Sequence, residues 1–149
     1  MPLLRLIIFA ALLIILSIAT IKRNHIWQND IAFWSDVAGK SPGIARPHNN
    51  IGSAMVNAGR CDDAMPSLLL SIKADPWYIE PHYNIAMCYI KKGRFDDAIP
   101  KLEEVLRINV VLKKGHYGVQ AASKLDLQAH SNLGNIYNTK GMTDKAIFH

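Results

Sequence analysis

The sequence has few of the residue patterns that enzymes and metalloproteins need. It contains no GxSxG, no phosphate-binding glycine loop and no HExxH sequence. Its two cysteines, Cys61 and Cys88, are spaced unlike any zinc-ligand set. We therefore expect no catalytic residue, no metal and no cofactor, and we predict that the chain is not an enzyme.

The small number of cysteines says little about the redox compartment. Two buried or reduced thiols are the expected state of Cys61 and Cys88, because free cysteine behaves as a small apolar residue. The count is even, so a disulfide stays open as the alternative.

Charge of one sign is not concentrated anywhere in the chain. Lys and Arg number 17 against 12 Asp and Glu, which gives a net charge of +5, but no run of basic residues is longer than two. A nucleic-acid-binding face would cluster its basic residues to displace counterions from phosphates. We expect no nucleic-acid partner.

The chain does have one long apolar run near its start. Leu6 to Ile21 carries no charge and, as a helix, would span about 24 Å at roughly 1.5 Å per residue. Leu3 and Leu4, with Arg5 extending outward, bring this close to the bilayer core of about 30 Å. We predict that residues 1–21 form a single transmembrane helix or signal anchor, with residues 3–21 in the membrane.

Two other interpretations of this run stay open. A cleaved signal peptide would use Arg5 as its basic region and Ser17 to Ala19 as its cleavage site. A buried core helix would need a large protein around it. Charge does not settle the orientation, because Arg5 lies on one side of the run and Lys22 and Arg23 lie on the other.

Internal self-similarity with a period of 34 residues is the strongest signal. His48 to Gly52 returns as His82 to Ala86. Gly59 to Ala64 returns as Gly93 to Ala98. A third copy comprises His130 to Gly134, Tyr137, Gly141 and Ala146. A fixed period of this length is the signature of stacked structural repeats.

The spacing within each copy predicts a pair of helices. Ile51 lies on the apolar face of a first helix, which ends near Gly59, where a left-handed residue is needed. Asp62 places an acid at the positive end of a second helix. Ala64 is small because the two helices cross closely there, and Pro76 cannot continue the second helix.

This pattern resembles the tetratricopeptide repeat (TPR) family in its period, its small eighth residue, its glycine at position fifteen and its alanine at position twenty. The resemblance implies an all-α fold, with an N-terminal transmembrane helix followed by a TPR helix-turn-helix solenoid. The expected parts are a linker and cap helix at 22–44, TPR 1 at 45–78, TPR 2 at 79–112, a degenerate or truncated repeat at 113–126 and an incomplete TPR 3 at 127–149.

Two segments depart from the repeat pattern. Val110 stands where the second repeat should have its proline, and 113–126 is too short for a full repeat, although Gly115 to Val119 looks like the start of one. A truncated repeat or a lone linking helix would both fit. Before the repeats, the amphipathic segment from about Asp30 to Lys40 has the register of a preceding second helix. We expect it to pack as a cap.

The junction before the repeats carries a second resemblance. The string that includes Arg23, Trp27, Phe33-Trp34 and Asp36 is similar to the junction of polytopic transmembrane-and-TPR proteins, some of which are O-mannosyltransferase-like. This implies repeats on the extracytoplasmic or lumenal side, and a chain that is a fragment of a larger protein. We expect Trp34 to pack in the core and leave Trp27 open between packing and a membrane-interface position.

Histidine and asparagine recur in the repeats. His48, His82, His116 and His130 hold equivalent positions, and we interpret them as packing residues because zinc ligands must all lie about 2 Å from one ion. Asn50, Asn84 and Asn132 follow two residues after a histidine, and Asn49, Asn57, Asn135 and Asn138 add to this column. The resemblance implies that it faces a concave groove, similar to the asparagine ladder of O-GlcNAc transferase.

The predicted function is a membrane-anchored scaffold that binds a protein or an extended peptide. An asparagine side chain can pair with a peptide backbone because it both donates and accepts. The expected peptide-binding residues are Asn50, Asn84, Asn132, Arg46, Tyr83, Met87 and Lys91. The alternatives are ordinary solvated or locally bonded asparagines, and a C-terminal accessory or substrate-recognition fragment of a polytopic membrane glycosyltransferase. Self-association through the uncapped last repeat is a further prediction.

Overall fold

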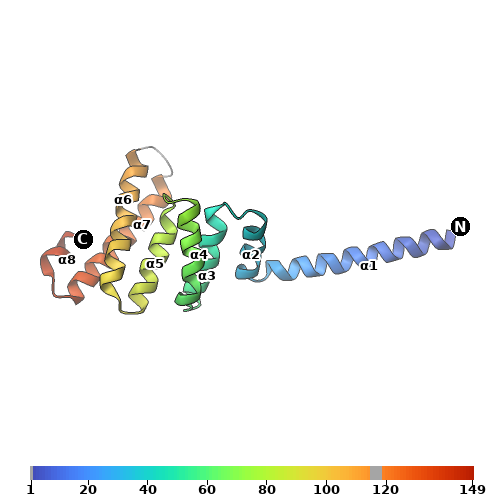
Figure 1. Ribbon diagram of the computed structural model, residues 1–149, viewed down its shortest axis with the longest axis horizontal. Coiled ribbons are helices and arrows are strands. Elements are labelled where there is room, and N and C mark those ends of the chain that lie inside the picture. Colours follow the sequence, from blue (N-terminus) through green and yellow to red (C-terminus); the bar gives the residue numbers. More distant parts are fainter. Residues whose placement is uncertain (1, 115–118) are drawn as a thin grey trace.

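The structure is a computed structural model that describes residues 2–114 and 119–149, and these residues form eight α-helices and no strand (Figure 1). The predicted all-α fold class is confirmed. The helices are α1 (Pro2–Trp27), α2 (Asp30–Lys40), α3 (Ala45–Asn57), α4 (Cys61–Ala74), α5 (Ile79–Lys91), α6 (Phe95–Lys114), α7 (Val119–Thr139) and α8 (Thr143–Phe148).

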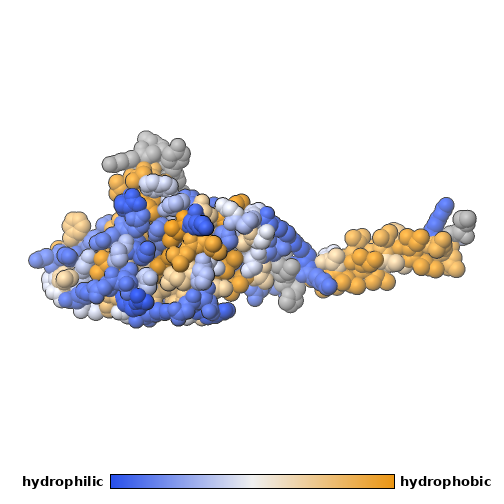
Figure 2. Space-filling view, viewed as in Figure 1, coloured by the Kyte–Doolittle hydropathy of each residue, from blue (hydrophilic) through white to orange (hydrophobic). Residues whose placement is uncertain are grey.

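Helix α1 extends away from the rest of the chain and is apolar over most of its length (Figures 1 and 2). The stretch Pro2–Asn24 is 23 residues long, and the rest of the described chain buries none of it. It is long and apolar enough to cross a membrane, and a signal sequence would meet the same description. The helix continues past Ile21 to Trp27, because the polar residues that follow the apolar run are compatible with a helix.

The turns of the repeats follow the predicted chemistry. Gly59, Gly93 and Gly141 have φ angles of 76°, 69° and 70°, in the left-handed region where a side chain would be strained. This confirms the prediction that a left-handed residue ends each first helix. At the start of α2 the side chain of Asn29 accepts a hydrogen bond of 3.1 Å from the Ala32 amide, so it caps that helix.

Helices α3 to α8 stack as three hairpins around a shared core. One cluster of buried side chains joins α3, α4 and α5 and includes Leu68 and Ile85. A second cluster joins α5, α6 and α7 and includes Leu102 and Leu133. Helix α5 contributes to both clusters, so it is the element through which the first hairpin and the rest of the stack support each other.

The extra residues between the second and third copies lengthen two helices. Helix α6 has 20 residues where α4 has 14, and α7 has 21 where α5 has 13. Val110 replaces the proline that would stop the helix, so α6 runs on to Lys114. Of the predicted segment 113–126, residues 113–114 end α6 and residues 119–126 begin α7, while 115–118 lie outside the described residues.

The first hairpin depends on a close crossing between α3 and α4 at Gly52. A Cβ atom added at Gly52 would lie 2.5 Å from the Cγ of Leu68, which is closer than real Cβ atoms approach. Leu68 is fully buried, so it has little room to move away. The second copy has Ala86 at this position, and Ala86 is also fully buried.

The substitution Gly52→Ala is expected to lower the free energy of unfolding by about 1–3 kcal/mol, which is typical of overpacking a core. Chemical denaturation of the full chain in detergent, followed by circular dichroism, measures this change. Gly39→Ala in α2 is the matched control, because a Cβ there meets nothing within 4 Å. Equal stability of the two variants would show that α3 and α4 do not cross this closely.

Candidate functional site

The first helices of the three hairpins, α3, α5 and α7, form the surface on which most of the predicted binding residues lie. Helix α5 packs against α3 on one side and against α7 on the other. We call this surface the first-helix face. Asparagines take part in two sets of contacts on this face, one between α3 and α5 and one between α5 and α7.

The first group of asparagines connects α3 to α5. The Asn84 amide nitrogen donates a hydrogen bond of 2.9 Å to the side-chain oxygen of Asn49. The Asn49 amide nitrogen in turn donates to the Asn50 oxygen over 3.4 Å, a longer and weaker contact. Asn49 is buried, with 4% of its surface exposed, so these bonds satisfy a polar group that would otherwise be costly. The Asn84 amide is therefore already engaged in a hydrogen bond between α5 and α3.

The second group connects α5 to α7. The Asn132 amide nitrogen donates to the Tyr83 hydroxyl at 3.2 Å and lies 3.6 Å from the sulfur of Met87. Asn132 is therefore in contact with both Tyr83 and Met87, and the sequence predicted all three as separate binding residues. They adjoin a shallow hollow between the two helices, lined by Tyr83, Leu127, Gln128, Ser131 and Asn132.

Three of the residues that line this hollow were not predicted. Leu127 is 73% exposed, although it is apolar, and Gln128 and Ser131 add donors and acceptors beside it. Leu127 and Ser131 lie four residues apart, so they share one side of α7. This spacing is the feature of the sequence that could have placed them together. The repeat pattern alone gives these residues no role, because they precede the recurring asparagine.

A second hollow lies where α2 meets α3. It is lined by Asp30, Trp34, Asn50, Ser53, Ala54 and Asn57. Asn50 and Asn84 are both half-buried, but Asn50 borders this hollow, whereas the Asn84 amide donates to Asn49. Trp34, from the cap helix, provides the apolar wall of this hollow.

The two predicted basic residues lie away from both hollows. The Lys91 ammonium donates a hydrogen bond of 2.7 Å to the Val56 carbonyl in the last turn of α3, where a cation is favourable. Arg46 lies beside Tyr78 at the edge of the stack. Burial raises the pKa of Tyr78, and the charge of Glu80 adds to the shift, while Arg46 opposes it.

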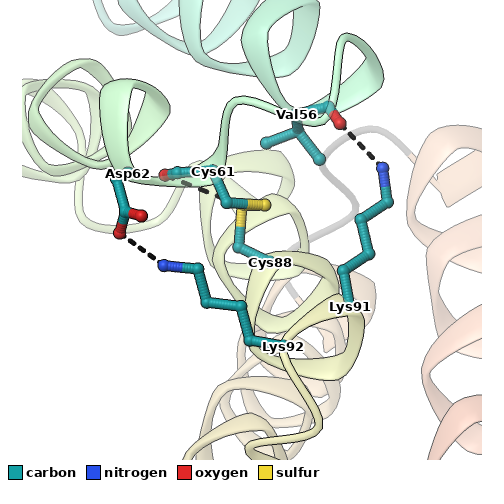
Figure 3. The surroundings of a disulfide bond; sticks show 6 residues. All are labelled: Val56, Cys61, Asp62, Cys88, Lys91 and Lys92. Carbon is teal, nitrogen blue, oxygen red and sulfur yellow. Dashed lines mark hydrogen bonds and ion pairs between the residues drawn. A yellow bond between two sulfur atoms is a disulfide. The ribbon is translucent and has the colours of Figure 1, made fainter.

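A disulfide joins the first two repeats at the turn between α3 and α4 (Figure 3). It pairs Cys61, the first residue of α4, with Cys88 of α5, with a Cα–Cα distance of 5.4 Å. Both residues are buried, as expected, but the expectation of two free thiols was wrong. The 34-residue register places the turn of one repeat beside the end of the next first helix, and neither cysteine alone reveals this.

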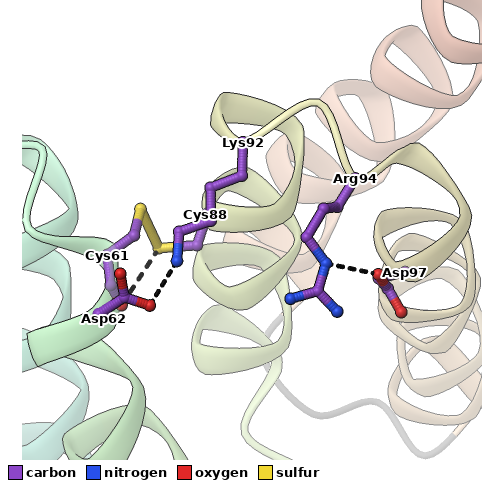
Figure 4. Close-up of polar contacts among 6 residues, drawn as sticks. All are labelled: Cys61, Asp62, Cys88, Lys92, Arg94 and Asp97. Carbon is purple, nitrogen blue, oxygen red and sulfur yellow. Dashed lines mark hydrogen bonds and ion pairs between the residues drawn. A yellow bond between two sulfur atoms is a disulfide. The ribbon is translucent and has the colours of Figure 1, made fainter.

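The same junction contains an ion pair that recurs in the next repeat. Lys92, at the end of α5, pairs with Asp62 at the start of α4 (Figure 4). Lys140, at the end of α7, pairs with Asp96 at the start of α6 in the same way. The acids of both pairs are highly exposed, so each pair contributes only about 0–1 kcal/mol. Their recurrence shows that all three hairpins stack in one register.

Three of the four repeat histidines, His48, His82 and His130, contact other parts of the chain or are buried in it. The His48 ring donates a hydrogen bond of 2.9 Å to the Pro42 carbonyl, in the turn before α3. His82 is buried, and this burial lowers its pKa, so the ring is neutral at pH 7. His130 lies against His149, and the predicted position His116 lies outside the described residues. Within residues 2–114 and 119–149, no three metal-binding side chains gather closely enough to hold an ion.

Reduction of the disulfide is expected to lower the free energy of unfolding by about 2–4 kcal/mol, because the bond constrains a loop in the unfolded chain. The separation between the cysteines is 27 residues. Thermal unfolding with and without reductant measures the change. The Cys61→Ala/Cys88→Ala double variant is the control, because reductant should leave its midpoint unchanged. An unchanged midpoint in the wild type would contradict the assigned bond.

Comparison with known proteins identifies the second hairpin. A family model described as Tetratricopeptide repeat matches residues 79–109, which span α5 and most of α6. No curated protein gives a significant match to the chain. The same turn glycine, small crossing residue and inter-repeat ion pair occur in the neighbouring hairpins. Residues 79–109 therefore match a tetratricopeptide repeat, as the sequence pattern predicted for this segment.

Proposed function

We propose that this chain is a membrane-anchored scaffold that holds an extended peptide, or an extended segment of another protein, on its first-helix face. Tetratricopeptide repeats generally serve as non-catalytic platforms for protein–protein interaction, and this chain has such a repeat at 79–109. The observation that carries the proposal is the pair of hollows on this face, each of which combines amide or hydroxyl groups with one apolar wall.

The groups that line the two hollows are polar or apolar, with Asp30 as the acid among them, and they favour a peptide backbone over an anionic ligand. Asn50 and Ser53 border the hollow between α2 and α3, and Gln128 and Ser131 border the hollow between α5 and α7. All four side chains can both donate and accept hydrogen bonds, as a peptide backbone requires. Lys91 already pairs with a main-chain carbonyl, so a strict carboxylate clamp is not favoured. Trp34 and Leu127 would contact apolar side chains of the ligand.

If this is correct, Asn50→Ala and Ser131→Ala should each weaken peptide binding about 2- to 12-fold, the equivalent of ~0.5–1.5 kcal/mol for one hydrogen bond. Peptides would be selected from a random unstructured library against the full chain in nanodiscs. Their affinities for each variant would then be measured by fluorescence anisotropy.

Ser67→Ala is the matched control for this experiment, because it makes the same change on α4, away from the first-helix face. If Ser67→Ala and Ser131→Ala weakened peptide binding equally, the peptide would not bind on the first-helix face. Asn84→Ala is expected to reduce both stability and binding, because Asn84 bonds to Asn49 between helices.

We also propose that the apolar stretch in α1 anchors the chain as a single membrane span, with the repeats on the extracytoplasmic or lumenal side. The buried disulfide supports this side, because disulfides form and persist in oxidising compartments and are rare in the cytosol. The basic residues that flank the span do not decide its orientation.

Thiol labelling in cells is expected to show the disulfide formed. Cells that express the chain would be quenched and denatured with a maleimide polymer, with or without prior reductant. We expect wild-type protein to gain mass only after reduction, and the Cys88→Ser variant to gain mass without it, because Cys61 is then unpaired. Labelling of the wild type without reductant would place the repeats in a reducing compartment.

The other two hypotheses stay predictions. An accessory role in a polytopic membrane glycosyltransferase rests only on the junction residues of the sequence. Self-association through the last repeat is compatible with α8, where Ile147 and Phe148 are each 79% exposed.

A further inference from the structure

Within residues 2–114 and 119–149, α1 contacts the rest of the chain through α2, at the end of α1. The apolar run ends at Ile21 and is followed by Lys22 and Arg23, both exposed. Trp27 is the last residue of α1 and is 64% exposed, which is high for an indole attached to a folded stack. Its position at the end of an apolar span requires an explanation.

Trp27 belongs to an aromatic corner between α1 and α2. Its ring meets Phe33 edge-on with centroids 5.8 Å apart, and Phe33 meets Trp34 edge-on at 4.8 Å. These distances are within the favourable range for aromatic pairs. The corner therefore holds the Trp27 ring against α2 and leaves about two-thirds of the residue's surface exposed.

An ion pair holds the two helices together beside this corner. Arg23 of α1 lies 3.0 Å from the Asp36 carboxylate of α2, and Lys40 lies 2.7 Å from the same carboxylate. The hydrogen bond from Lys40 is the main cause that lowers the pKa of Asp36, and Arg23 adds to it. The ionised acid can therefore pair with Arg23 beside the contact between α1 and α2.

The length of the helix places Trp27 near the edge of a bilayer. Pro2 to Ile21 would cover about 30 Å at 1.5 Å per residue, which matches the hydrocarbon core. Trp27 lies six residues further, or about 9 Å, and helix side chains lean back toward the N-terminus. The ring therefore reaches toward the headgroup layer, which is roughly 5–8 Å deep on each side.

We propose that Trp27 is an interfacial anchor that inserts its indole into the phospholipid headgroup layer. This inference rests on the membrane span of the proposed function. An indole suits that layer because its ring is apolar and its N–H can donate to lipid or water. The aromatic corner and the Arg23–Asp36 pair then start the repeat stack at the bilayer surface, without a flexible tether.

The other two tryptophans differ in their surroundings. Trp34 is half-buried and lines the hollow between α2 and α3. Trp77 lies between α4 and α5, where the Arg107 guanidinium covers its ring at 5.6 Å. Trp77 is therefore a suitable control, because it is a partly exposed indole on the repeat stack that we do not expect to contact lipid.

Fluorescence quenching in lipid vesicles tests the proposal. The full chain with Trp34→Phe/Trp77→Phe keeps only Trp27, and the full chain with Trp27→Phe/Trp34→Phe keeps only Trp77. Each is reconstituted into phosphatidylcholine vesicles with and without lipid brominated near the headgroup end of its acyl chains. We expect the Trp27 emission to be blue-shifted and strongly reduced by bromine, while the Trp77 emission is unaffected.

Vesicle flotation, measured on the same samples, separates this proposal from the membrane span itself. Protein that floats with the vesicles while bromine quenches Trp27 no more than Trp77 overturns the anchor and leaves the span standing. Protein that does not float overturns both. Protein that floats with selective quenching of Trp27 supports the anchor.

Discussion

Each helical hairpin in this protein has apolar side chains that it cannot bury alone, and the structure depends on neighbouring hairpins covering them in one constant register. Helix α5 shows the constraint most directly, because it contributes Ile85 to one core cluster and Ala86 to the other. A rotation of α5 that exposed either residue would open one of the two cores. Stability in such a stack comes from each repeat together with its contacts to its neighbours.

The register explains why the links between repeats recur where they do. The end of each following first helix lies beside the start of the preceding second helix, so Lys92 meets Asp62 and Lys140 meets Asp96. At the first junction the same proximity brings Cys61 to Cys88. The longer α6 and α7 do not disturb this arrangement, because both extend on the same side of the stack (Figure 1).

The proposed binding face has to serve two purposes. Asn49 and Asn84 bond to each other between α3 and α5, and Asn132 bonds to Tyr83 between α5 and α7, so part of the asparagine column holds helices together. A ligand would instead contact the residues that border open space, such as Asn50 and Ser131. Buried amides must be hydrogen-bonded, whereas half-exposed ones can exchange water for a ligand.

The sequence by itself determined the helical repeats, their turns and the apolar first helix, because these depend on local rules: side-chain periodicity, the left-handed turn at Gly59 and the uncharged run up to Ile21. The tertiary structure decided which of the predicted residues meet. It paired Cys61 with Cys88, placed the Lys91 ammonium on the Val56 carbonyl, and added Leu127 and Ser131 to the candidate site. These outcomes depend on distances between helices that are far apart in the chain. A repeat period predicts that such helices pack together, but it does not predict which of their side chains come into contact.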